Sequence, residues 1–354
     1  MKKLKKLLAL LTAVAMLTAM AACGTSESAS EKSETSSQTT ESTAAEETTG
    51  AAEGSQAEPT VEGTYKVGIC QLVQHEALDA ATQGFKDALT EKLGDSVTFD
   101  EQNASGDSAN CSTIINGFLS DGTDLILANA TAPLQAAAAA TSEVPVLGTS
   151  VTDYATALEL SDWNGTVGTN VSGTSDLAPL DQQAAMIKEL FPDAKKVGLL
   201  YCSAEPNSVY QCDVMEEYLT EEGYEVQRFA FTDTNDVSSV TQSACESVEV
   251  IYIPTDNTAA SNTEAIANMV LPAGTPVVAG EEGICKGCGV ATLSISYYDL
   301  GYATGEMAYE ILVNGADVST MPVEYAATVT KKYNAANCDT LGITIPDGYE
   351  AIEE

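Results

Sequence analysis

Residues 65–89 read YKVGICQLVQHEALDAATQGFKDAL and contain one complete unit of an α/β fold. The unit begins with a short apolar run that includes β-branched valine and isoleucine, which predicts a strand. From residue 78 onward, apolar side chains recur at helical spacing, which predicts an amphipathic helix. The polar residues between these elements, Gln71 and His75 among them, follow the carboxyl end of the strand. Open α/β sheets bind their ligands at this position, so the loop is a candidate site.

The same unit recurs along the rest of the chain. Strand-like apolar runs alternate with helical patterns, and they lie at 97–100, 124–128, 144–150, 196–201, 225–231, 250–254, 276–280 and 289–295. A helix is also predicted over 176–190, and two further strand-like runs within 323–345. Strands and helices that alternate through short loops form parallel sheets with right-handed crossovers. Two such series predict two doubly wound lobes with a ligand cleft between them.

The charge of the chain restricts its partners. The 354 residues include 52 acidic and 15 basic residues, for a formal net charge of −37. Phosphate backbones require lysine and arginine, so nucleic acid is not an expected partner. A charge of this size favours solubility and mutual repulsion, and we therefore expect a monomer.

Residues 1–23 have the pattern of a bacterial lipoprotein signal peptide. Four lysines within 2–6 precede an apolar run, and Met-Ala-Ala-Cys-Gly at 20–24 provides a small-residue cleavage site that ends in Cys23. This sequence resembles a lipobox, with methionine in place of the usual leucine, so Cys23 is expected to be lipidated. The alternative is ordinary secretory cleavage. Residues 24–63 consist almost entirely of small and polar residues, which predicts a disordered tether. Together these features predict a protein anchored by lipid on the extracytoplasmic face of a bacterial cell membrane.

The remaining cysteines raise the question of metal or redox chemistry. Eight cysteines follow Cys23, and Cys285 and Cys288 form a C-x-x-C motif. The chain has one histidine and no second close cysteine pair, so no metal site is expected. We interpret the motif as small buried residues or a local disulfide.

No catalytic motif is present in the sequence. The first strand is not followed by the glycine spacing that admits a pyrophosphate, and no G-x-S-x-G elbow occurs. A single histidine leaves few ways to build a catalytic triad. We therefore expect no catalytic residues and no cofactor.

The polar loops after the predicted strands suggest a clasp for a zwitterion. In the first series, Thr131 lies at a helix start, where free N–H groups and the helix dipole suit a carboxylate. In the second series, Asp256 and either Glu281 or Glu282 suit an ammonium group. Adjacent glutamates cannot both be charged in one site without a raised pKa, so only one is expected to contact the ligand.

Several separate motifs resemble one family. QLVQH at 71–75, NVSGTSD at 170–176, EPNS at 205–208, YIPTDN at 252–257 and GEEG at 280–283 are similar to the substrate-binding lipoproteins of ABC transporters of the tryptophan/tyrosine-uptake type. The resemblance covers about residues 65–354. It implies a type I periplasmic-binding-protein architecture, in which two Rossmann-like lobes joined by a hinge close on a small molecule. Partner permease and ATPase subunits are implied as well.

The resemblance also implies lobe boundaries and ligand contacts. The N-terminal lobe is expected over 64–172 plus 291–318, and the C-terminal lobe over 173–290 plus 319–354. The ligand is expected to be an aromatic or hydrophobic amino acid. The positions expected to line the cleft are Gln71, His75, Thr131, Ser203, Glu205, Asn207, Ser208, Asp256, Asn257 and Glu282.

Two other functions remain open from the sequence. The same fold also serves binding proteins for sugars, nucleosides or signalling molecules, although the mapped loops contain few aromatic residues to stack on a sugar ring. An exported thiol-redox enzyme is the other alternative, and it would require Cys285 and Cys288 to be redox-active.

Overall fold

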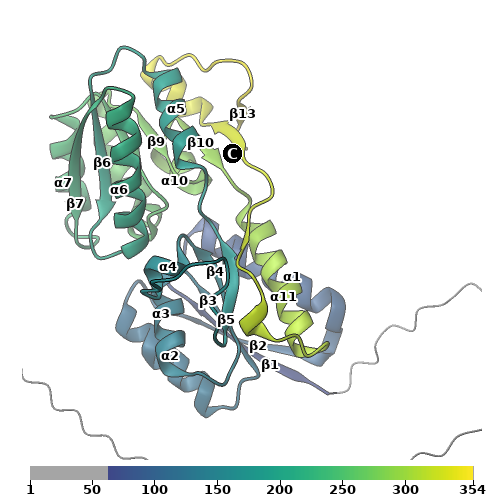
Figure 1. Cartoon of the computed structure of the whole chain (residues 1–354). Coiled ribbons are helices and arrows are strands. Elements are labelled where there is room, and N and C mark those ends of the chain that lie inside the picture. The colour runs from purple at the N-terminus through teal and green to yellow at the C-terminus, as the bar shows by residue number, and fades with distance from the viewer. Residues whose placement is uncertain (1–62, 354) are drawn as a thin grey trace, which may run out of the picture. The chain divides into compact units, whose positions relative to one another are not determined.

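The computed structural model describes residues 63–353. The predicted signal peptide, its lipobox cysteine Cys23 and all but the last residue of the predicted tether lie outside this range. Among the described residues, no helix has both the length and the apolar character needed to cross a membrane. The described chain builds two parallel-sheet lobes, each covered by helices on both faces (Figure 1).

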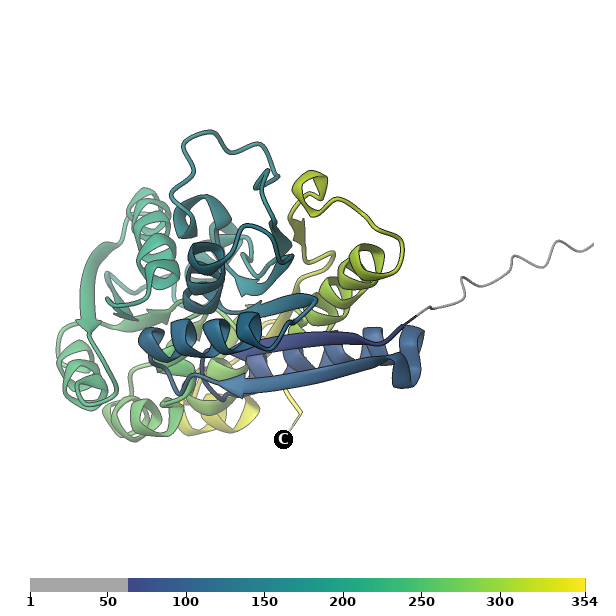
Figure 2. The ribbon, with the colours of Figure 1, turned by 90° about the horizontal axis from the view of Figure 1, so that it is seen from below.

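The first lobe is organised around a six-stranded sheet in which every pairing is parallel. In spatial order its strands are β11 (Glu324–Tyr325), β5 (Val171–Ser175), β4 (Val146–Val151), β3 (Leu125–Asn129), β1 (Tyr65–Gln71) and β2 (Val97–Asn103). Strand β1 lies between β2 and β3, so the winding direction reverses beside it (Figure 2). Gln71 and Asn129 are register partners at the ends of β1 and β3. The loops after these strands are therefore neighbours at the switch point, where doubly wound sheets bind ligands.

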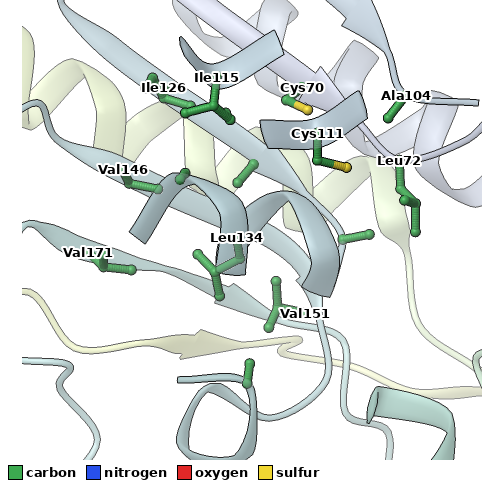
Figure 3. Close-up of a cluster of buried hydrophobic side chains, with 14 of the residues drawn as sticks. Cys70, Leu72, Ala104, Cys111, Ile115, Ile126, Leu134, Val146, Val151 and Val171 are labelled. Atoms are coloured by element: carbon green, nitrogen blue, oxygen red, sulfur yellow. The ribbon is translucent and has the colours of Figure 1, made fainter. Parts of the chain in front are cut away.

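Alternation along β1 distributes its side chains between two cores. Val67 and Ile69 pack in the cluster beneath α1 (Glu76–Leu93) and α11 (Tyr297–Leu312). Cys70 points to the opposite face, into the cluster shown in Figure 3. The helices on that face are α2 (Ser108–Ser120), α3 (Thr131–Ala140) and α4 (Tyr154–Ala157). Because both faces of the sheet are covered, its inner strands β1, β3, β4 and β5 are buried along most of their length.

The second lobe repeats this plan with a seven-stranded sheet. In spatial order its strands are β13 (Glu350–Ala351), β12 (Thr330–Tyr333), β10 (Ala291–Ser294), β9 (Val277–Ala279), β8 (Val250–Ile253), β6 (Lys196–Cys202) and β7 (Glu225–Phe231). All pairings are parallel except that of β10 with β12. Its switch point lies between β6 and β8.

Two further cores flank the second sheet. One contains residues of α5 (Leu180–Leu190), α6 (Pro206–Glu221) and α12 (Ala335–Leu341). The other contains residues of α7 (Val237–Cys245), α8 (Asn257–Ala260), α9 (Thr263–Ala273) and α10 (Glu282–Cys288). The short 3-10 helices η1 (Gly94–Ser96) and η2 (Val318–Thr320) lie in connections of the first lobe.

Three chain segments connect the lobes, from β5 to α5, from β10 to α11 and from β11 to β12. Figure 1 shows these crossings between the two sheets. The predicted fold class, an α/β protein with two doubly wound lobes on a hinge, is confirmed.

The predicted lobe boundaries need correction at the crossings. Residues 291–294 were assigned to the first lobe, but as β10 they pair with β9 in the second sheet. Residues 324–325 were assigned to the second lobe, but as β11 they pair with β5 in the first, and β5 itself extends to Ser175. A buried strand has the same apolar pattern in either sheet, so its local sequence does not reveal which sheet it joins.

The helix predicted over 176–190 begins later than expected. Helix α5 starts at Leu180 after Pro179, and a proline disfavours helical backbone in the residue before it. Asp176 is consequently free to serve in the crossing segment. Strand β5 and helices α10 and α12 were not predicted.

Candidate functional site

An interlobe cavity of about 10 Å³, room for about one water molecule, lies where the loops after the strands of both sheets converge. Pockets that hold small-molecule ligands usually measure about 300–1,000 Å³, so a ligand can enter this cavity only when the lobes move apart or the lining side chains rearrange. The first lobe contributes three lining residues, the crossing segments two and the second lobe six. They are His75, Leu78, Ser150, Asp176, Tyr297, Asn207, Thr255, Asp256, Asn257, Ala260 and Glu281.

The cavity is lined by three carboxylates and by no lysine or arginine. Asp176, Asp256 and Glu281 are all buried. Burial penalises the charged form of each group and raises its pKa above the ordinary value. The pKa of Asp256 rises to about 8, to which the charge of Glu205 also contributes, and the pKa of Glu281 rises to about 7. A ligand cation would replace the lost solvation of these carboxylates.

Asp176 lies in the first crossing segment, and its carboxylate accepts hydrogen bonds from two other segments of the chain. Its Oδ1 accepts a hydrogen bond from Thr152 Oγ1 at 2.9 Å, and its Oδ2 accepts one from Tyr297 OH at 2.9 Å. Because each carboxylate oxygen can accept two hydrogen bonds, both retain capacity for a ligand.

Asp256 and Glu281 each cap a short helix of the second lobe. Asp256 accepts from the backbone N–H of Ala259 at 2.7 Å and of Cys202 at 2.6 Å. Glu281 accepts from the backbone N–H groups of Gly283 and Ile284 at the start of α10. These bonds fix the orientation of both carboxylates.

The first lobe presents the start of α1 to the cavity. His75 is the N-cap residue of this 18-residue helix, and no side chain caps the helix there. The first N–H groups of an uncapped helix and its dipole favour an anionic group. The start of α1 thus suits an anionic group through its backbone, while its first turn also carries the acidic side chains of Glu76 and Asp79.

The two lobes touch directly beside the cavity. His75 Nε2 lies 3.2 Å from Asn257 Oδ1, and Lys286 Nζ lies 3.2 Å from Glu76 Oε1. Burial lowers the pKa of His75, which favours the neutral imidazole. The Asn257 side chain is itself held by Glu205, whose Oε2 accepts from Asn257 Nδ2 at 2.7 Å.

Comparison with known proteins identifies the family. Residues 66–351 match the model of a family described as ABC transporter substrate binding protein. The chain is a member of this family. Among curated proteins, this substrate-binding protein is 36% identical to the tyrosine-binding protein of Clostridioides difficile (strain R20291) over 278 residues, which cover 78% of this chain and 79% of the relative.

Solved structures agree with this assignment. The substrate-binding protein is similar to a Streptococcus pneumonia ABC domain in complex with L-Trp, with 32% identity, a TM-score of 0.78 and coverage of 82% of this chain and 100% of that one. It is also similar to the ligand-free, open structure of a Clostridium difficile substrate-binding protein with adhesive properties, with 37% identity, a TM-score of 0.63 and coverage of 82% and 99%. A leucine-binding protein from Thermotoga maritima, 17% identical with a TM-score of 0.51, shares the fold over 69% of this chain and 81% of its own. The predicted type I periplasmic-binding-protein architecture is thus confirmed.

The TM-scores also bear on the arrangement of the lobes. The score is higher for the L-Trp complex than for the open structure, although the open structure is slightly more similar in sequence. The present structure therefore resembles the L-Trp complex more closely, in accord with the direct contacts of His75 with Asn257 and of Glu76 with Lys286.

Four of the ten predicted ligand contacts line the interlobe cavity of this substrate-binding protein: His75, Asn207, Asp256 and Asn257. Glu205 lies behind them, where it holds Asn257 and also accepts from the Thr258 backbone N–H at 2.8 Å. 

Two predicted residues support the cavity from nearby. Thr131, the first residue of α3, lies beside a narrow adjoining crevice that also touches Asn207 and has no room for a water molecule. Ser208 is fully buried and hydrogen-bonds to Asp256, which steadies that carboxylate.

Three predicted residues lie away from the cavity because other groups occupy their polar atoms. Gln71 donates to Val73 O and Asp79 Oδ1 and accepts from Thr82, so it braces the loop after β1. Ser203 donates to Phe231 O at 3.1 Å. Glu282 forms an ion pair with Lys332 at 2.6 Å, and its neighbour Glu281 takes the position in the cavity.

Six lining residues, Leu78, Ser150, Asp176, Thr255, Ala260 and Tyr297, were not among the predicted contacts, and Glu281 was predicted only as the alternative to Glu282. Asp176 lies in a crossing segment that was interpreted as a helix start. The 170–176 motif was a signal for Asp176, and Ser150 lies at the end of the strand predicted over 144–150, where a ligand loop begins.

The C-x-x-C motif lies in α10 inside the second lobe. Cys285 and Cys288 are buried among apolar side chains, and the described cysteines are free thiols. Burial raises the pKa of Cys285 and of Cys288, which disfavours the reactive thiolate. Among residues 63–353 no cluster of metal-ligating side chains is present. This environment gives the redox-enzyme alternative no support.

Proposed function

We propose that this protein captures an amino acid, most favourably an aromatic one, in the interlobe cavity and delivers it to an ABC permease. The observation that carries the proposal is the charge pattern of the cavity. Asp176, Asp256 and Glu281 face a ligand ammonium group, while the uncapped start of α1 faces its carboxylate. A zwitterion matches both walls, and a neutral sugar matches neither. Relatives described as tyrosine-binding or bound to L-Trp support the same ligand class.

The proposed mechanism is closure of the lobes around the ligand. Residues from both lobes and from the crossings line one cavity, so a ligand makes its full set of contacts only when the lobes are together. Ligand binding then shifts the population toward the closed arrangement. Small-angle X-ray scattering with and without ligand tests this mechanism, and an unchanged radius of gyration under saturating ligand would contradict it.

The test of the ligand class is a thermal-shift screen of the purified full-length chain after removal of co-purified ligand. L-tryptophan, L-tyrosine and L-phenylalanine are compared with sugars and nucleosides. A ligand at 100 times its Kd stabilises the folded state by about 2.7 kcal/mol, which raises the Tm by several degrees. A Tm increase with aromatic amino acids alone supports the proposal. An increase with a sugar or nucleoside alone would show that the ligand class is wrong.

We also propose that the protein acts as a monomer, held on the extracytoplasmic face of the cell membrane by a lipid on Cys23, alongside permease and ATPase subunits. The support is the lipobox-like sequence before Cys23 and membership of an ABC transporter family. Radiolabelled palmitate should label the wild-type protein in cells but not the Cys23→Ser variant. Equal labelling of both would contradict lipidation at this residue.

A further inference from the structure

Ser150 differs from the other cavity residues in backbone conformation. It lies in β4 with φ of +56°, a left-handed conformation that is uncommon for residues other than glycine. The pairing of β4 with β5 shifts register between Gly148 and Val151, so β4 contains one residue more than the strand opposite. Such bulges re-aim a side chain, and strained residues of this kind cluster at ligand sites.

The Ser150 hydroxyl also has no protein partner. The side chain is 6% exposed, and its Oγ makes no hydrogen bond to any described residue. In the described chain, three other buried side-chain oxygens also lack a hydrogen-bond partner. They belong to Thr123, Asn129 and Thr292, none of which lines the interlobe cavity. An unpaired buried hydroxyl is costly, and a ligand atom in the cavity would satisfy it.

The neighbours of Ser150 indicate which ligand group it meets. The backbone N–H of Asp176 donates to Val151 O at 3.2 Å, and Thr152 Oγ1 donates to the Asp176 carboxylate. Ser150 thus adjoins the segment that holds the Asp176 carboxylate in the same cavity. A ligand carboxylate at this end would be repelled by Asp176, whereas an ammonium group would be attracted.

We propose that Ser150 is a specificity-determining residue that accepts a hydrogen bond from the ligand's ammonium group, next to the Asp176 carboxylate. The inference rests on the proposed function, because it assigns one group of the proposed amino-acid ligand. It implies that the cavity selects ligands that have a primary ammonium group. A site built to hydrogen-bond such a group rejects analogues that lack it, because its own buried polar atoms are then left unpaired.

The experiment compares Ser150→Ala with wild type in the full-length chain against three probes, by calorimetric titration. L-tryptophan and tryptamine have the ammonium group, whereas 3-indolepropionate lacks it. We expect Ser150→Ala to weaken binding of L-tryptophan and tryptamine about 10- to 100-fold and to leave the Kd of 3-indolepropionate within about twofold. The corresponding tyrosine series replaces these probes if L-tyrosine is the ligand. Thr292→Val is the matched control, since it removes an unpaired buried hydroxyl outside the cavity, and it should alter none of these constants.

The outcomes separate the two proposals. If wild type binds no amino acid, the proposed function fails, and the assignment of Ser150 to an ammonium group fails with it. If wild type binds L-tryptophan and Ser150→Ala binds it equally well, or loses all probes equally, only the assignment fails. The Tm of unliganded Ser150→Ala should equal or exceed that of wild type, because no protein hydrogen bond is lost and an unpaired buried hydroxyl is removed. A fall of more than about 3 °C would show a structural role instead and overturn the proposal.

Discussion

At the residue scale, two adjacent glutamates have different environments. Glu281 is 3% exposed, lines the interlobe cavity and caps α10, whereas Glu282 pairs with Lys332 near the crossings. A one-residue difference in position thus decides which carboxylate is desolvated. Glu281 is the residue whose ionisation depends on pH near neutrality, because burial raises its pKa to about 7, and the charges of Glu76 and Glu282 add to the effect.

This environment predicts a pH-dependent stability. A carboxyl group whose pKa is higher in the folded than in the unfolded state stabilises the fold at acid pH, and this contribution is lost as pH rises through the folded pKa. The Tm of the unliganded protein should therefore fall between about pH 5 and pH 9, through the titration of Glu281 and of Asp256 near pH 8. Binding of an ammonium ligand should strengthen over the same interval. Differential scanning fluorimetry across this range measures both effects.

The variants Glu281→Gln and Glu282→Gln form a matched pair for this test. Glu281→Gln removes the group that titrates near pH 7, so its Tm should depend less steeply on pH. Glu282→Gln makes the same change outside the cavity and should keep the wild-type slope. Parallel Tm profiles for wild type and Glu281→Gln would show that titration of Glu281 does not cause the pH dependence of the Tm.

At the element scale, α1 and α11 pack backbone against backbone. The contact occurs where glycines face the other helix: a Cβ on Gly84 would overlap the Tyr298 carbonyl oxygen, and one on Gly301 would overlap the Ala81 carbonyl oxygen. This close approach matters for the site, because both helices start at the cavity. His75 precedes α1, and Tyr297 is the first residue of α11. The glycine pair therefore sets the spacing between His75 and Tyr297.

Gly84→Ala should destabilise the protein by about 1–3 kcal/mol, since the two backbones would have to separate. Alanine normally improves a helix interior by about 0.5–1 kcal/mol, so the sign is opposite to that of helix propensity. Gly117→Ala in α2 is the control, because its Cβ would meet nothing within 4 Å and the variant should be stabilised. Urea unfolding measures both, and stabilisation by Gly84→Ala would show that the helices are less closely packed.

At the scale of the whole domain, the described lobes touch through side chains at several points, among them Gln211 Nε2, which donates to Thr152 Oγ1 at 3.2 Å. The Glu76–Lys286 pair and the His75–Asn257 hydrogen bond connect the start of α1 with the second lobe. An exposed ion pair contributes about 0–1 kcal/mol, so the Glu76–Lys286 pair can bias an open–closed equilibrium without locking it. A ligand that binds the closed arrangement more tightly than the open one can then shift the equilibrium toward closure.

Lys286→Glu should place like charges across the cleft and shift the unliganded protein toward the open arrangement. We expect a larger radius of gyration in small-angle scattering and a severalfold weaker ligand affinity, since fewer molecules are closed before binding. The exchange Glu76→Lys with Lys286→Glu restores opposite charges and should restore both values. Lys331→Glu is the control, because its partner Glu189 lies in the same lobe. An equal effect of Lys331→Glu would point to net charge rather than to the interlobe pair.

The sequence by itself determined the repeating unit, the fold class and the polar loops that form the cleft. These properties follow from local periodicity. In β1 and α1, for example, apolar residues recur with the 2-residue period of a strand and the 3.6-residue period of a helix. The family motifs also led to His75, Asn207, Asp256 and Asn257, which do line the cavity.

Only the tertiary structure decided which sheet β10 and β11 join, which of Glu281 and Glu282 is buried in the cavity, and that Ser150 projects an unpaired hydroxyl there. Each of these depends on contacts between residues far apart in the chain. A strand buried on both faces has the same pattern in either sheet, and adjacent identical side chains have the same local sequence signal. Their environments are set by the elements that pack against them, which local periodicity does not encode.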